Sequence, residues 1–225
     1  LKKIPCFDLN AACTGFIYSL SVAYALVNSK LYKNILVIGA ETLTRIIDIK
    51  NRNTAVLFGD GAAAAIVGEV EEGYGILGFS IGAEGEDDMI LKVPAGGSKK
   101  PNDEETVKNR ENFVVMKGQE VFKFAVRVLP KVTLEALKKA KLNVQDLSMI
   151  FPHQANLRII ESAAKRMKFP LEKFYMNLSR YGNTSSASVG IALGEAIEKG
   201  LVKKGDNIAL TGFGGGLTYG SVIIK

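Results

Sequence analysis

Hydrophobic residues near the start of the chain recur at helical spacing. Within residues 13–29 the apolar positions Phe16, Leu20 and Ala23 follow one another at steps of four and three, which predicts a helix. Three apolar runs are typical of strands: 4–9, 35–39 and 55–67. The last run is interrupted by an Asp60-Gly61 turn signal. Because a strand, a helix and a strand follow in this order, the pattern favours a parallel sheet.

A polar stretch from Gly82 to Asn112 follows, and its composition is typical of a solvated surface excursion. Beyond it the alternation of helical and strand-like spacing resumes. The pattern there predicts helices over 118–140, 155–167 and 186–199, a strand ending at Phe151, a strand over 174–177 and two closing strands. The chain is therefore expected to be α/β on both sides of the polar stretch.

The two α/β regions look like copies of one unit. In each, a helix leads to an apolar strand, a glycine-bearing turn and a second apolar strand, with Cys13 and Thr184 at matching positions. We therefore predict a half carrying a nucleophile over 1–81, a polar connection over 82–116 and a second half over 117–225. The second half has much more chain ahead of its matching position, so we expect the first half to be N-terminally incomplete and this chain alone to be insoluble or inactive.

Composition narrows the class of protein. The chain has 225 residues, 47% hydrophobic and 23% charged, which excludes disordered, collagen-like and coiled-coil proteins. Its net charge of +6 is a mild basic bias that favours an acidic partner over a nucleic acid. No apolar run reaches the roughly 18 residues of a membrane span, and the start lacks the apolar core of a signal peptide. We expect a soluble, cytoplasmic protein without a membrane or nucleic-acid partner.

Two cysteines and one histidine restrict the chemistry further. They cannot form a disulfide framework, and a zinc site is hard to assemble from them, so we expect no metal. Cys13 lies at the start of a predicted helix, where free backbone amides and the helix dipole favour a thiolate. Cys6 lies inside a predicted strand and is expected to be a small buried hydrophobic residue.

Polar residues at the ends of other elements are candidates for the same site. His153 follows a strand and a proline, at the edge where open α/β sheets bind ligands, although a lone histidine is more often structural. Asn183 precedes a predicted helix within a run of small polar residues, and its alternative role is that of an ordinary loop residue beside an N-cap.

Two further patterns admit a structural and a functional interpretation. The glycine-dense run 211–218 matches neither a phosphate-binding loop nor a dinucleotide fingerprint. It is either a tight turn or a place where backbone amides approach an oxyanion. Arg158 and Lys165 share one face of a predicted helix, with Arg166 beside them, which is either a solvated face or a surface for a partner.

The order Cys13, His153, Asn183 also suits a papain-like cysteine hydrolase, since 140 residues separate the first two. Against that interpretation, Cys13 is followed by Thr14-Gly15-Phe16, the chain has no tryptophan, and the duplicated α/β pattern is wrong for it. A binding or structural protein with the same fold but no catalytic activity is a further alternative. The presence of Cys13, His153 and Asn183 together speaks against it.

Five segments together resemble β-ketoacyl-acyl-carrier-protein synthase III, an initiating condensing enzyme of type II fatty-acid synthesis: Asp8–Phe16, Phe58–Ala62, Pro152–Ile159, Gly182–Ser185 and Phe213–Thr218. The resemblance implies a thiolase-like α/β fold of two similar βαβαβ-type halves in α/β/α/β/α layers, with the first half truncated. Elongating synthases use a second histidine and thiolases a late second cysteine, and this chain has neither.

The resemblance also implies an acyltransferase mechanism without a cofactor, in which acyl-CoA is a substrate. Cys13 would take the acyl group, and the backbone amides of Cys13 and Gly215 would hold the oxyanion. His153 and Asn183 would then stabilise the enolate formed when malonyl-acyl-carrier protein loses carbon dioxide. A different acyl primer, as in quinolone, ketone or polyketide starter synthesis, stays open.

Substrate and partner contacts follow from the same resemblance. Arg52 would lie against the CoA adenine, Phe122 and Asn156 along the pantetheine, and Phe58 and Phe213 in the substrate pocket. An acidic carrier protein would dock on a basic helix surface made of Gln154, Ala155, Asn156, Leu157, Arg158, Lys165 and Arg166. A homodimer is expected. Beside Arg52 this chain has Asn53 where the family often has glycine. This difference concerns the fine geometry of the entrance for CoA and not the chemistry.

Overall fold

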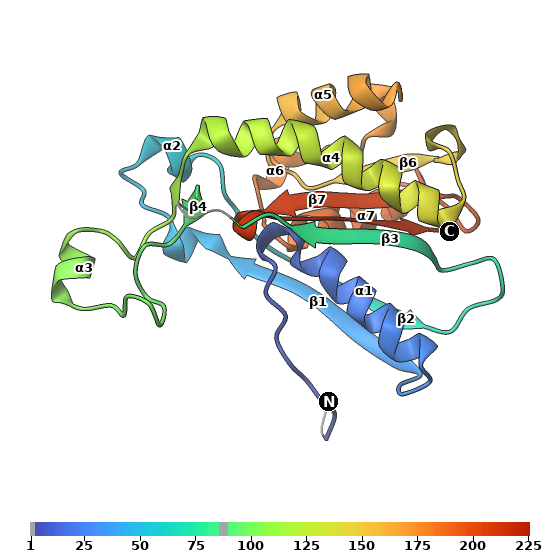
Figure 1. The fold of residues 1–225 in the computed structure, drawn as a ribbon, viewed down its shortest axis with the longest axis horizontal. Helices are drawn as coiled ribbons and strands as arrows, with labels where there is room; N and C mark the ends of the chain where they lie inside the picture. Colours follow the sequence, from blue (N-terminus) through green and yellow to red (C-terminus); the bar gives the residue numbers. More distant parts are fainter. Residues whose placement is uncertain (1–2, 86–89) are drawn as a thin grey trace.

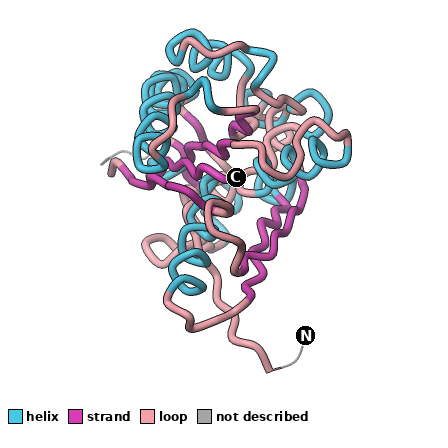
Figure 2. Tube along the Cα trace, turned by 90° about the vertical axis from the view of Figure 1, so that its right-hand side faces the viewer, coloured by secondary structure: helices cyan, strands magenta, loops and turns pink. Residues whose placement is uncertain are grey.

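The computed structural model describes residues 3–85 and 90–225, which fold into stacked layers of helices and strands (Figure 1). Helices α4 and α5 cover one face of a four-stranded sheet, and α1 and α7 cover the other. A two-stranded sheet lies beyond α1 and α7, so that helices lie between the two groups of strands (Figure 2). These helices are α1 (Gly15–Asn28), α4 (Gly118–Ala140), α5 (Leu157–Met167) and α7 (Ala187–Glu198).

The larger sheet has the strand order β3-β8-β7-β6. Its strands are β3 (Ile76–Ala83), β6 (Met149–Pro152), β7 (Ile208–Gly214) and β8 (Thr218–Ile224). Only β6 and β7 run parallel in it, whereas β3–β8 and β7–β8 are antiparallel. The prediction of a parallel sheet is therefore wrong for most of it, because β7 returns directly into β8 without a crossover helix.

The smaller sheet pairs β1 (Asn34–Thr42) with β2 (Asp60–Gly68) in antiparallel register. In both halves a helix thus leads into an antiparallel pair, α1 into β1 and β2, and α7 into β7 and β8. This is the internal repeat that the sequence predicts. Strand β3, most of which the sequence places in the first half, pairs with β8 of the second.

The remaining elements are short. They are η1 (Ala12–Thr14), η2 (Leu43–Ile46), α2 (Arg52–Ala55), β4 (Leu91–Lys92), α3 (Glu104–Lys108), β5 (Val115–Met116), η3 (Val144–Asp146), η4 (Leu171–Lys173), α6 (Leu178–Tyr181) and η5 (Gly215–Leu217). The predicted polar excursion therefore contains β4, α3 and β5. Its α3 segment extends away from the layers (Figure 1) and is tied back by an ion pair between Arg110 and Asp48.

Three predicted strand segments differ from the structure. Residues 4–9 form no strand, because no neighbouring strand pairs with them, and Cys6 is exposed rather than buried. Residues 174–177 make only an isolated bridge, from Phe174 to Ile150. Asp60 begins β2 instead of interrupting a strand, since its carboxylate accepts the backbone N–H of Thr44 at 2.9 Å.

Two hydrophobic clusters lie on opposite faces of the larger sheet. One packs α4 and α5 against it through side chains such as Val128, Leu129 and Ile160, and the other packs α1 and α7 through Ile17 and Val189. Each large buried side chain contributes about 1.5–3 kcal/mol of hydrophobic stabilisation. The predicted helices therefore form because their apolar stripes have a sheet face to cover.

Within residues 3–85 and 90–225, no helix is long and apolar enough to cross a membrane. The same residues contain no group of three or more histidine, cysteine, aspartate or glutamate side chains that could hold a metal ion.

Strand β3 and helix α4 approach so closely at Gly78 that a side chain has no space there. A Cβ on this glycine would lie 2.6 Å from the backbone N of Ala140 and 2.8 Å from the carbonyl oxygen of Ala136. We predict that Gly78→Ala lowers the free energy of unfolding by about 1–3 kcal/mol. The exposed Gly194 of α7 has open space around it, so Gly194→Ala, as a matched control, should stabilise by up to about 1 kcal/mol. Urea unfolding of both full-length variants checks this, and equal effects would contradict it.

Candidate active site

Cys13 lies in the short helix η1, at the junction between the N-terminal segment and α1. The junction is tied to β8 because the Thr218 hydroxyl donates to the Ala11 carbonyl at 2.9 Å and lies 2.9 Å from the Thr14 hydroxyl. Gly214, the last residue of β7, packs directly on the cysteine, since a Cβ there would lie 2.6 Å from the Cys13 nitrogen. The glycine-dense run therefore gives the Cys13 backbone room beside the sheet.

Burial has the largest effect on the pKa of the Cys13 thiol. The residue is only 6% exposed, and burial raises the pKa of its thiol to about 11, with a smaller contribution from the Glu41 carboxylate. A hydrogen bond from the Ser185 side chain acts in the opposite direction. The sequence predicts that the helix start favours a thiolate, but desolvation outweighs that effect here. The resting residue is therefore a thiol at neutral pH.

His153 follows β6 and is buried, with 2% of its surface exposed. Its backbone N–H donates to the Thr211 carbonyl at 2.7 Å, and its ring lies edge-on to Phe213 with centroids 5.5 Å apart. The Nδ1 atom lies 2.7 Å from the Ser188 hydroxyl of α7. Burial lowers the pKa of His153 to about 4, so the imidazole is neutral. When Ser188 donates to Nδ1, the ring proton is on Nε2.

Asn183 is held by both halves of the repeat. Its backbone N–H donates to the Leu57 carbonyl at 2.8 Å, and its carbonyl accepts from Gly59 at 2.9 Å. Its side-chain oxygen accepts the N–H of Ser185 at 2.8 Å. The amide Nδ2 group is therefore the part of this side chain left to donate to a ligand.

One cavity of about 490 Å³ brings these groups together, since Cys13, His153 and Asn183 all line it. They come from the start of α1, the end of β6 and the loop before α7. The remaining lining is mostly apolar and includes Leu57, Phe122 and Met116. A buried thiol beside two amide or imidazole donors can bind a carbonyl compound, form a covalent adduct and stabilise negative charge on an oxygen.

Most of the predicted substrate contacts lie in this cavity. Phe58, Phe122, Asn156 and Phe213 line it, whereas Arg52, exposed at the start of α2, is not among the lining residues. Asn156 also caps α5, because its side-chain oxygen accepts the Arg158 backbone N–H at 2.9 Å.

The predicted oxyanion donor Gly215 follows Gly214, the glycine that packs on Cys13, in the sequence. A Cβ on Gly215 would lie 3.5 Å from the Leu91 carbonyl oxygen and 3.6 Å from Ala12. Gly215 is not among the residues that line the cavity, whereas Gly214 is. The role of the Gly215 N–H therefore stays a prediction.

The predicted docking surface is incorrect at Gln154. This residue is 1% exposed, and its amide Nε2 donates to the Pro152 and Tyr175 carbonyls while its oxygen accepts from the Asn177 and Leu178 N–H groups. Gln154 therefore links β6 to the following loops, and its buried side chain is not accessible to a partner. A glutamine two residues after the end of a strand gives no sequence signal of this burial.

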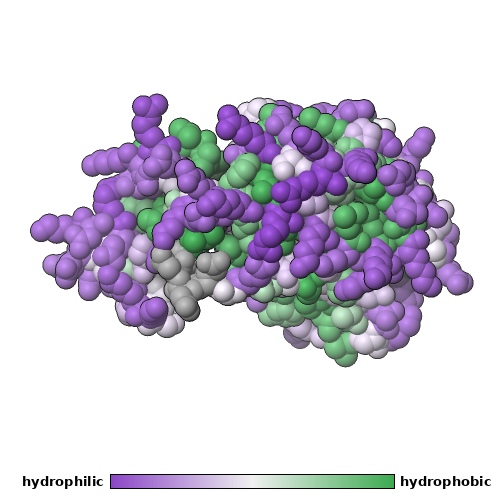
Figure 3. Space-filling view, turned by 45° about the horizontal axis from the view of Figure 1, so that its top comes forward, coloured by the Kyte–Doolittle hydropathy of each residue, from purple (hydrophilic) through white to green (hydrophobic). Residues whose placement is uncertain are grey.

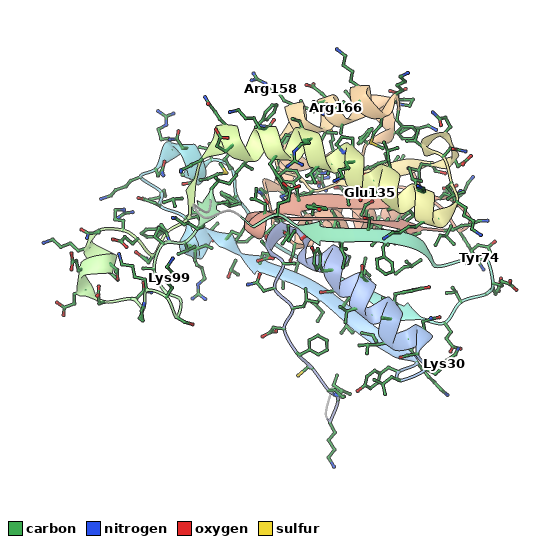
Figure 4. All side chains as sticks on the ribbon, viewed as in Figure 1. Lys30, Tyr74, Lys99, Glu135, Arg158 and Arg166 are labelled. Carbon is green, nitrogen blue, oxygen red and sulfur yellow. The ribbon has the colours of Figure 1, made fainter. Side chains whose placement is uncertain are left out.

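The rest of that surface is accessible. Ala155 lines the cavity, Leu157 is 47% exposed, and the cationic residues of α5 are exposed as well. Arg158 and Arg166 lie on α5 at the top of the molecule (Figure 4). Hydrophilic side chains predominate on the face that carries α4 and α5 (Figure 3). Arg158 and the exposed Lys123 of α4 also line the cavity, so this face meets the cavity.

Sequence reasoning missed Ser185, Ser188 and Glu41 as parts of the site. The two serines belong to the small polar run after Asn183, which signalled a loop without showing which side chains point inward. Glu41 does not line the cavity, but it contacts Ser186 beside the site because β1 packs next to α7.

Comparisons with known proteins give one consistent family. Residues 7–85 match the family model described as 3-oxoacyl-[acyl-carrier-protein (ACP)] synthase III, and residues 137–225 match its C-terminal counterpart. β-Ketoacyl-[acyl-carrier-protein] synthase III of Fusobacterium nucleatum subsp. nucleatum is 88% identical over 225 residues, which are 100% of this chain and 69% of that protein. The enzyme of that name from Caldanaerobacter subterraneus subsp. tengcongensis is 55% identical, over 97% of this chain and 66% of its own length.

Solved structures agree with the sequence relatives. The crystal structure of 3-oxoacyl-[acyl-carrier-protein] synthase III from Aquifex aeolicus VF5 has a TM-score of 0.88 and 43% identity, and covers 100% of this chain and 68% of that one. The Thermus thermophilus synthase III structure has a TM-score of 0.87 and 45% identity, with coverage of 97% and 67%. The chain thus spans about two thirds of the length of these relatives, and the predicted thiolase-like α/β fold is confirmed.

The high pKa of Cys13 gives a direct test of its environment. In a Cys6→Ser background, which removes the exposed second thiol, alkylation by iodoacetamide should accelerate about tenfold per pH unit from neutral pH, because only the thiolate reacts. The rate should level off only near the pKa of about 11. Mass spectrometry of the full-length protein follows the reaction, and Cys13→Ser is the blank. A plateau below pH 9 would contradict the effect of burial.

Proposed function

The chain belongs to the 3-oxoacyl-[acyl-carrier-protein] synthase III family, and we propose that it catalyses the condensation of an acyl-CoA primer with malonyl-acyl-carrier protein. The products are a 3-oxoacyl-carrier protein, CoA and carbon dioxide. The observation that carries the proposal is the shared cavity in which Cys13 meets His153 and Asn183. A nucleophile and two neutral donors are what the two half-reactions need.

In the first half-reaction the Cys13 sulfur attacks the thioester carbonyl of the acyl-CoA. The C–S bond to CoA breaks, and CoA leaves as a thiol that takes up the proton lost by Cys13. The backbone N–H groups of Cys13 and Gly215 are proposed to hold the oxyanion during this step. The Ser185 hydrogen bond supports the sulfur as it loses its proton, since this contact lowers the pKa of the thiol.

In the second half-reaction the malonyl thioester replaces CoA in the cavity. His153 donates from Nε2 and Asn183 from Nδ2 to the thioester oxygen, so that negative charge collects there as the carboxylate leaves as carbon dioxide. The enolate carbon then attacks the acyl carbonyl on Cys13, the C–S bond to the enzyme breaks, and the released Cys13 thiolate takes up a proton from solvent to restore the thiol. A neutral imidazole suffices for this role, consistent with the lowered pKa of His153.

The surroundings of the cavity support the two substrates. The apolar lining from Phe58 and Phe122 suits the acyl chain and the pantetheine arm, and Asn156 offers a polar contact beside them. The exposed cations Arg158, Lys165 and Arg166 of α5 suit an acidic carrier protein. The contact of Arg52 with adenine, the homodimer and the cytoplasmic location stay predictions from the family resemblance.

The two half-reactions can be separated by mutation in the full-length enzyme. His153→Ala and Asn183→Ala should still gain one acetyl group from acetyl-CoA, seen by intact mass. Each should lower the release of labelled carbon dioxide from malonyl-carrier protein by about 10²–10³-fold, since an enolate donor is lost. Cys13→Ser should show no adduct. Wild-type decarboxylation in either variant, or an adduct in Cys13→Ser, would overturn the proposal.

Charge reversal on α5 tests the docking surface. Arg158→Glu with Lys165→Glu should raise KM for malonyl-carrier protein by about tenfold or more, because two attractions to an acidic partner become repulsions. KM for acetyl-CoA should change little. Lys204→Glu with Lys225→Glu, on the opposite end of the sheet beside Tyr74, is the matched control. Equal effects on both substrates would argue against carrier docking at α5.

A further inference from the structure

Glu41 reaches from the first half of the repeat to a helix of the second. It lies near the end of β1, where alternate residues Val37, Gly39 and Glu41 turn towards the helices. Its Oε1 atom accepts the backbone N–H of Ser186 at 3.2 Å and also accepts the Ser186 hydroxyl. One carboxylate oxygen therefore accepts from both donor groups of the N-cap residue of α7.

Helix α7 lacks an N-terminal anion of its own. Its first turn contains no acidic residue, and the N-cap Ser186 makes no side-chain capping bond to it. Unpaired N–H groups and the helix dipole favour a negative charge at this end. Glu41 supplies that charge from a strand distant in sequence.

Ser186 belongs to the turn that carries the site. Asn183 and Ser185 precede it, and Ser185 has a φ of +48°, a left-handed conformation that costs free energy in a residue with a side chain. The Ser185 side chain bonds to Cys13, and its backbone N–H bonds to the Asn183 side chain. Holding Ser186 in place therefore holds both contacts.

The turn packs closely against β1 but also borders an open space. A Cβ on Gly39 would lie 3.2 Å from the Ser186 hydroxyl oxygen and 3.3 Å from Cα of Ala187, which shows how closely β1 approaches the start of α7. A polar space of about 290 Å³ lies on the other side, lined by Asn10, Glu41 and Ser186 among others. Without the carboxylate, Ser186 would have room to move towards this space.

We propose that Glu41 is a positioning residue of the condensing site, which fixes Ser185 and Asn183 relative to Cys13 by anchoring Ser186 from the opposite half of the molecule. The proposal rests on the proposed function for its condensation readout. Glu41 itself touches neither the reacting sulfur nor a substrate.

The negative charge of Glu41 acts on the pKa of the Cys13 thiol, which a residue with only a packing role would not do. The carboxylate raises the pKa of the Cys13 thiol, adding to burial, while the Ser185 hydrogen bond lowers it. Glu41 does not line the cavity of Cys13, whose other titratable lining residues are His153, which is neutral at pH 7, and the exposed Lys123 and Arg158. Removing the negative charge should therefore lower the pKa of Cys13.

The experiment compares Glu41→Gln and Glu41→Ala in full-length protein, with Glu72→Gln in the exposed β2–β3 turn as the control. Glutamine keeps an oxygen that accepts from Ser186, so kcat for condensation should stay within about threefold of wild type. Alanine removes the acceptor, so kcat should fall by about tenfold or more with KM for acyl-CoA little changed. In a Cys6→Ser background, the pH profile of Cys13 alkylation should shift to lower pH in Glu41→Gln.

Wild-type kcat in Glu41→Ala, or an unshifted alkylation profile in Glu41→Gln, would overturn the proposal. If Glu41→Ala does not fold, the alkylation profile and kcat of Glu41→Gln still decide it. A wild-type protein that fails to condense, with the alkylation shift present in Glu41→Gln, would overturn the proposed function instead. The two failures are therefore distinguishable.

Discussion

The site depends on the backbone contact that joins the two halves of the repeat at Asn183. This residue exchanges two hydrogen bonds with the segment after α2, through Leu57 and Gly59, and forms a parallel bridge with Phe58. The nucleophile belongs to one half, whereas His153 and Asn183 belong to the other. Because buried backbone groups need partners, the contact fixes the docking of the halves as well as the local loop. The distance from the sulfur to its two donors is thus a property of the whole fold.

Burial then determines the chemistry of each group. Desolvation keeps Cys13 as a thiol and His153 as a neutral imidazole, in the direction expected for charged forms removed from water. The Ser185 hydrogen bond opposes this effect at the sulfur, whereas the Ser188 hydroxyl lies against Nδ1 and, when it donates, stabilises the neutral ring. Such donors gain strength where water is excluded, which suits a reaction whose difficult step places charge on a substrate oxygen.

Much of the fold and the central residues could be predicted from sequence, because they rest on local signals. Helix α4 matches its expected range of 118–140, and Cys13, His153 and Asn183 stand out by their places at element ends. The predictions that were wrong or missing concern residues whose role depends on contacts with segments distant in sequence. The segment 4–9 has strand-like residues but no neighbour, and Gln154 resembles a surface residue although four backbone groups bind it. Glu41 carries no local signal, since its role arises only where β1 meets α7.

The pKa values of the two titrating groups of the cavity lie far apart, and this determines how the site responds to pH. Because burial lowers the pKa of His153 to about 4 and raises the pKa of Cys13 to about 11, both groups of the unliganded site stay neutral from roughly pH 5 to pH 10. A change of pH within that range would therefore leave both groups in the same protonation state. Any pH sensitivity of the reaction within that range would have to enter through the substrates or through the charged exterior of the protein.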